Sequence, residues 1–109
     1  MAPATERRSE RVLADVPVMV RGQSAGEGSF QEETFTVTVN AHGAMVMLAA
    51  NVALGQSITL VRLNDLAERD CRIAFRGRDH AGLAQVGLEF LEPSPGFWPV
   101  DAPASWLGA

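Results

Sequence analysis

Apolar and polar residues alternate along much of this chain of 109 residues, a pattern typical of β-strands with one buried face. The clearest run covers residues 34–39, where Phe35, Val37 and Val39 alternate with threonines. We expect these three residues to share one face of a strand, because side chains two positions apart point to the same side. Similar runs predict further strands over residues 16–21, 44–48, 58–62, 71–76 and 83–91.

The spacing of these runs predicts the fold class. About six short strands in a chain of this size indicate an all-β fold, either a small antiparallel barrel or a sandwich. Residues 22–33 contain three glycines and no apolar period, so we expect a loop or a wide hairpin connection there. Residues 44–48 are almost entirely apolar, which predicts burial of both faces. Turns are expected over residues 40–43, 64–69 and 77–82.

The two ends of the chain differ from this central region. Residues 1–11 are small, polar and charged, and we expect them to form a flexible arm. Residues 93–109 hold four of the six prolines and both tryptophans, which predicts a short irregular tail. Trp98 and Trp106 are expected to cap the β-domain, because they offer large apolar surfaces. The expected organisation is an arm over 1–11, a β-domain over 12–92 and a tail over 93–109.

Charge and hydropathy narrow the range of partners and locations. The net charge of −4 and the pI of about 5.0 argue against a general affinity for nucleic acid or anionic membranes, so neither DNA nor RNA is expected as a partner. No window approaches eighteen consecutive apolar residues, so membrane insertion is not expected either. The first residues lack the apolar core of a signal peptide, and we therefore expect a cytoplasmic protein.

Few residues could support catalysis or metal binding. The only cysteine, Cys71, alternates with Ile73 and Phe75 and is expected to be a buried core thiol. The only histidines, His42 and His80, have no metal-ligand spacing with that cysteine. No serine or histidine has the neighbours of a nucleophile or a general base. The sequence thus predicts a non-catalytic protein without a metal or cofactor.

Three motifs, in this order along the chain, resemble the PilZ domain family. Arg7 and Arg11 have the RxxxR spacing of the family's arginine motif, with Arg8 beside the first arginine. Residues 38–43 align with a second motif, [D/N]-x-S-x-x-G, and residues 87–90 with the G-[VL]-x-F of the last strand. The resemblance covers roughly residues 7–92. It implies a six-stranded antiparallel β-barrel that receives the bacterial second messenger cyclic di-GMP.

The resemblance also implies a binding site. Guanidinium groups pair bidentately with phosphate or with a guanine edge, and all nine basic residues of the chain are arginine. In the second motif, Thr38 replaces the acidic or amide residue and Asn40 replaces the serine. Loss of one charge-assisted hydrogen bond costs about 1.5–3 kcal/mol, or roughly ten- to a hundredfold in affinity. The implied ligand-binding residues are Arg7, Arg8, Arg11, Thr38, Asn40 and Gly43, with His42 as a further candidate contact.

Two functions from different classes remain open. The leading hypothesis is a receptor or adaptor that binds cyclic di-GMP and signals to a downstream protein. The alternative is a degenerate PilZ scaffold that binds no nucleotide and acts through protein contacts, using an edge strand or the tryptophan-containing tail. In that case the arginines, flanked by Glu6 and Glu10, form weak solvated ion pairs, and residues 40–43 serve only as a turn.

Overall fold

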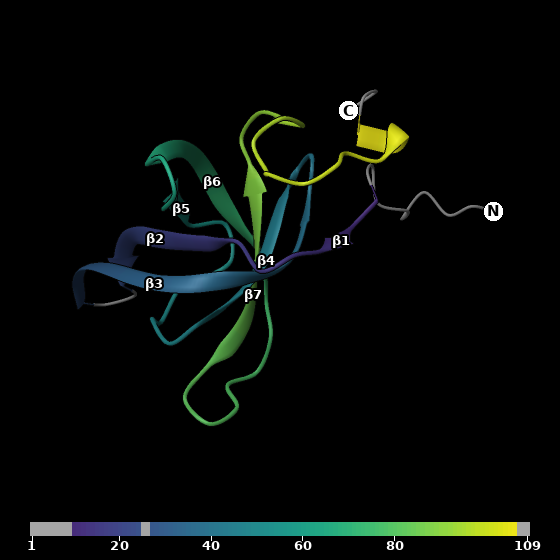
Figure 1. The fold of residues 1–109 in the computed structure, drawn as a ribbon. Helices are drawn as coiled ribbons and strands as arrows, with labels where there is room; N and C mark the ends of the chain where they lie inside the picture. The colour runs from purple at the N-terminus through teal and green to yellow at the C-terminus, as the bar shows by residue number, and fades with distance from the viewer. Residues whose placement is uncertain (1–9, 25–26, 107–109) are drawn as a thin grey trace.

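The computed structural model describes residues 10–24 and 27–106, and within them it is a β-barrel with a C-terminal tail (Figure 1). The only helical element of these residues is a single 3₁₀ turn, η1. No helix of the described residues is long and apolar enough to cross a membrane. The elements are β1 (Val12–Leu13), β2 (Pro17–Ser24), β3 (Glu27–Asn40), β4 (Gly43–Leu48), β5 (Ser57–Arg62), β6 (Ala67–Arg76), β7 (Ala84–Phe90) and η1 (Ala104–Trp106).

The strands close into the small barrel that the sequence predicted. Neighbouring strands run antiparallel in the order β3-β2-β5-β6-β7-β4, and β4 pairs again with β3 to close the ring. This closure leaves no free edge among the six barrel strands. The short β1 adds to β3 outside the ring, where Val12 pairs with Val39 and Leu13 with Thr38.

The core confirms most of the predicted alternation. Val18 and Val20 of β2 are fully buried. In β7, Val86 is fully buried and Leu88 is almost fully buried. Cys71 is also in the core, and burial raises the pKa of its thiol to about 12. The prediction that this cysteine is a structural thiol is therefore confirmed.

Of the two alternatives predicted for residues 22–33, the structure shows a hairpin and not a loop, because residues 22–24 and 27–33 continue a strand pair. β2 extends to Ser24 and β3 begins at Glu27, with Gly22 paired to Phe30 and Val20 to Glu32. Gly22 is useful here because a β-carbon at this position would lie 2.9 Å from the Ile58 side chain. The glycine allows β5 to approach closely, so tertiary packing outweighs its low strand propensity. The turn predicted over 64–69 is also shorter, because β6 begins at Ala67.

A bulge in β3 overturns the predicted face of the clearest strand. The register shifts between Thr36 and Thr38, so Val37 is an extra residue on this strand. Thr36 points into the core and is 1% exposed, whereas Phe35 is 59% exposed. The buried hydroxyl of Thr36 donates to the Ala14 carbonyl and accepts the Val16 amide. These two hydrogen bonds compensate the burial of a polar group.

A second bulge, in β6, turns Phe75 outward. The register shifts between Ile73 and Phe75, so Ala74 is the extra residue and Phe75 pairs with Gly87. The expectation that Phe75 continues the buried face of Cys71 is therefore wrong. The expectation for residues 44–48 is also wrong, because the outward side chains of Met45 and Met47 are only half-buried.

The tail packs against the barrel as predicted for its tryptophans. Trp98 and Trp106 are almost completely buried and belong to the core cluster. The Trp98 ring stacks on Phe90 with the ring centroids 6.0 Å apart, and Phe97 meets both rings edge-on. Figure 1 shows η1 beside the start of β1, near the first described residues.

Candidate functional site

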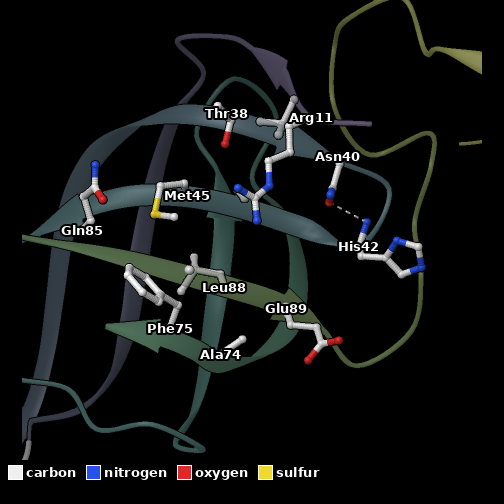
Figure 2. Close-up of a pocket in the computed structure, with 13 residues that line it drawn as sticks. Arg11, Thr38, Asn40, His42, Met45, Ala74, Phe75, Gln85, Leu88 and Glu89 are labelled. Carbon is white, nitrogen blue, oxygen red and sulfur yellow. Dashed lines mark hydrogen bonds between the residues drawn. The ribbon is translucent and has the colours of Figure 1, made fainter. Parts of the chain in front are cut away.

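A pocket of about 550 Å³ lies on the outer surface of the barrel, over the ends of β3, β4, β6 and β7 (Figure 2). Its volume is within the range of small-molecule sites. Both bulges are next to it, since Thr38 and Phe75 follow the register shifts and line the pocket. Bulges commonly redirect side chains beside functional sites.

Four of the residues predicted from the motifs line this pocket: Arg11, Thr38, Asn40 and His42. Arg11 precedes the other three residues by at least 27 positions in the sequence. Gly43 does not line the pocket. Arg7 and Arg8 lie outside the described residues. The structure thus brings together the second arginine of the first motif and most of the second motif.

Among the described residues that line the pocket, Arg11 is the arginine. It directly precedes β1, whose pairing with β3 places it beside the end of that strand, and its side chain points into the pocket (Figure 2). The ion pairs between described residues use the other arginines Arg21, Arg62, Arg72 and Arg76. Within the described part of the chain, the Arg11 guanidinium therefore has no carboxylate partner.

Thr38 and Asn40 lie on the same side of β3, as their spacing predicted. The side-chain oxygen of Asn40 accepts the backbone N–H of His42 at 2.9 Å. This is an Asx turn, in which the asparagine side chain closes the chain reversal after a strand. The turn chemistry expected of residues 40–43 is therefore present, and it uses one lone pair of the oxygen that a guanine would need.

Gly43 shapes the site through the backbone. It begins β4 and pairs with Glu89 of β7. A β-carbon built at Gly43 would lie 1.8 Å from the Leu88 carbonyl oxygen. Only glycine permits this close approach of the two strands, so Gly43 supports the wall of the pocket without contacting its interior.

Further residues that the sequence did not predict line the pocket, among them Met45, Phe75, Gln85 and Glu89. Gln85 and Glu89 alternate with the buried residues of β7, so the period of that strand was a signal for them. Phe75 carried no such signal. Its outward direction depends on the bulge opposite Gly87, which leaves open space that the aromatic ring can cover.

In the part of the chain that the structure describes, the pocket combines the Arg11 guanidinium with an apolar wall. Glu89 forms an ion pair with Arg72 across β6 and β7, so its negative charge is offset locally. Met45 and Phe75 provide apolar surface on the same side of the barrel as Arg11. A guanidinium beside an exposed aromatic ring suits a ligand with an anionic part and a flat ring, as in a nucleotide.

Two comparisons with known proteins identified no related protein. No protein-family model matches the chain, and a search of curated proteins finds no match. Among the residues the structure describes, no three His, Cys, Asp or Glu side chains are grouped as metal ligands would be. The function must therefore be inferred from the fold and the pocket.

Proposed function

We propose that the protein is a PilZ-like receptor that binds cyclic di-GMP and catalyses no reaction. One observation carries this proposal: Arg11 and the end of β3, which belong to two separate sequence motifs, meet at one pocket on a six-stranded barrel. In this proposal the protein acts in the bacterial cytoplasm and passes the signal to a protein partner.

The pocket chemistry supports a dinucleotide ligand. Arg11 pairs with a phosphate or with guanine O6 and N7, and Arg7 and Arg8 supply further cations from the preceding segment. A guanine ring stacks on Phe75, while Thr38 and Asn40 offer polar contacts at the opposite side. No covalent step is involved.

The substitutions in the second motif predict modest affinity. Thr38 provides no charge-assisted bond, and the Asn40 oxygen already accepts the His42 amide. Each charge-assisted bond is worth about 1.5–3 kcal/mol, so we expect micromolar binding.

Titration calorimetry with cyclic di-GMP tests the proposal. We expect saturable heat with the native protein and none with the Arg7→Ala/Arg11→Ala double variant. Arg78→Ala is the control. Arg78 is exposed in the β6–β7 hairpin, so its substitution removes a positive charge away from the pocket. No heat from the native protein at high ligand excess would refute the receptor hypothesis, and so would equal binding by the double variant.

A scaffold that acts through protein contacts is the second candidate. It is favoured by exposed apolar side chains beside β1, where Leu13, Phe35 and Val37 surround a hollow of about 580 Å³. Leu13 and Phe35 are exposed and lie together at this hollow, and contiguous apolar patches, unlike single exposed residues, mark interaction surfaces. This candidate predicts that no heat is observed with cyclic di-GMP.

A further inference from the structure

The C-terminal tail makes hydrogen bonds to the two segments that carry the polar side of the pocket. The first set reaches the turn after β3. The Ser94 amide donates to the Ala41 carbonyl at 2.8 Å, and the Trp98 indole N–H donates to the Asn40 carbonyl at 3.0 Å. Both acceptors lie within or next to the Asx turn that orients Asn40 and His42.

The second set holds the residue that precedes Arg11. The Trp106 indole N–H donates to the Glu10 carbonyl at 2.6 Å, and the Glu10 amide donates to the Ser105 hydroxyl oxygen at 3.0 Å. The tail therefore binds both backbone groups of Glu10. Trp106 is itself fully buried and belongs to the core cluster, so these bonds connect the chain just before Arg11 to the core.

The other restraint on Arg11 in the described chain comes from the residues that follow it, because Val12 and Leu13 pair with β3 and Val12 packs against the core. β1 is only two residues long, and a strand of this length pairs weakly on its own. None of the ion pairs between described residues involves the Arg11 guanidinium. The backbone position of Arg11 consequently depends on how firmly Glu10 is held as well as on the short β1.

We infer that Ser105 and Trp106 are positioning residues that hold Arg11 ready for an anionic ligand in the pocket. The ligand part of this inference rests on the proposed function. Holding Arg11 before the ligand arrives lowers the ordering cost of binding, which raises affinity without a new contact. By linkage, a ligand bound to Arg11 strengthens the attachment of the tail by the same factor by which the tail raises ligand affinity. Occupancy of the pocket is therefore coupled to the attachment of η1.

A purely structural role of the tail predicts a different result. If Trp106 only fills space, a phenylalanine that keeps a ring in the core should preserve binding. The comparison therefore uses Trp106→Phe with Ser105→Ala, which removes both bonds to Glu10. The control is Trp98→Phe, which also removes one indole bond, but a bond to Asn40 and not to Glu10.

The first experiment needs no ligand. Backbone ¹⁵N relaxation of the full chain gives the order parameter of the Arg11 amide. We expect about 0.85 in the native protein and in Trp98→Phe, and less than about 0.6 in the Ser105→Ala/Trp106→Phe variant. An Arg11 amide that stays equally rigid in all three proteins would overturn the inference, whether or not cyclic di-GMP binds.

The second experiment is a double-mutant cycle with cyclic di-GMP as the probe. Loss of the two tail bonds is expected to weaken binding by about two- to tenfold in the native background. It should have no further effect when Arg11 is already alanine, because residues that act through one another are not additive. Equal losses in both backgrounds would mean that the tail acts through general stability, which contradicts the positioning role. If the native protein binds no cyclic di-GMP, the proposed function fails, and the order parameters alone decide the positioning role.

The tail also provides its own reporter. The chain has no tyrosine, and its only tryptophans are Trp98 and Trp106. In Trp98→Phe, intrinsic emission excited at the indole band therefore comes from Trp106 alone. We expect cyclic di-GMP to change this emission in Trp98→Phe but not in Trp98→Phe/Arg11→Ala. An emission change that persists without Arg11 would contradict a connection through Arg11.

Discussion

Gly43 is expected to be the glycine whose replacement this barrel tolerates least. An alanine β-carbon would lie 1.8 Å from the Leu88 carbonyl oxygen, 2.8 Å from the Leu88 carbonyl carbon and 3.1 Å from the Glu89 Cα. All three are backbone atoms of β7, so no side-chain rotation relieves the contact. To reach ordinary contact at 3.4 Å, β4 and β7 must separate by more than an ångström at the point where they pair.

The expected loss follows from that displacement. Overpacking of a well-packed interior costs about 1–3 kcal/mol, and more where backbone must move, so we expect Gly43→Ala to lose about 3 kcal/mol. For a domain of this size the loss corresponds to a fall in Tm of roughly 12–24 °C. Urea unfolding followed by far-ultraviolet circular dichroism measures it.

Gly96→Ala is the matched control for this prediction. A β-carbon at Gly96 meets no atom within 4 Å, so the free energy of unfolding should change by less than about 0.5 kcal/mol. If Gly43→Ala were as stable as Gly96→Ala, the close approach of β4 and β7 would not limit this position. The reasoning that Gly43 acts through the backbone would then be refuted.

Three further predictions concern separate parts of the molecule. Thr36→Val should lower the free energy of unfolding by about 1–3 kcal/mol in urea titrations, because it leaves two buried backbone groups without partners; an unchanged value would contradict the assigned hydrogen bonds. Hydrogen bonds from Arg62 and from the Ala67 amide lower the pKa of Asp65 from 3.8 to about 2, so the stability that the ionised Asp65 adds is present above pH 3.8 and is lost as the pH falls towards 2. In Asp65→Asn this part of the pH dependence of unfolding should disappear, and the same pH dependence in both proteins would refute the prediction. Phe75→Ala should unfold almost as the native protein does but bind cyclic di-GMP roughly five- to 150-fold more weakly in calorimetry, whereas unchanged affinity would exclude stacking on this ring.

The sequence predicted the β-barrel because its alternation is local and regular over most strands. Val18 and Val20, and equally Val86 and Leu88, point inward as the period of two requires. The errors fall where pairing between distant strands changes that period. No local pattern reveals that β3 has an extra residue at Val37, because the bulge exists only relative to β4.

The candidate site was predictable only where local motifs indicated its residues. The two motifs pointed to Arg11, Thr38 and Asn40, and the barrel brings these residues to one pocket. Phe75 could not be predicted, since its direction is set by the register of β6 against β7. The bonds from the tail to Glu10 join residues 95 and 96 positions apart, and no sequence pattern indicated them.

The binding of cyclic di-GMP at this pocket is tested most directly by an NMR titration of the ¹⁵N-labelled native protein. We predict saturable shift changes at the amides of Arg11, Thr38, Asn40 and Phe75, with little change at Phe35, which lines the apolar hollow. An unaltered spectrum at ligand excess would contradict a nucleotide site in this pocket, as would shifts confined to the surface around Phe35.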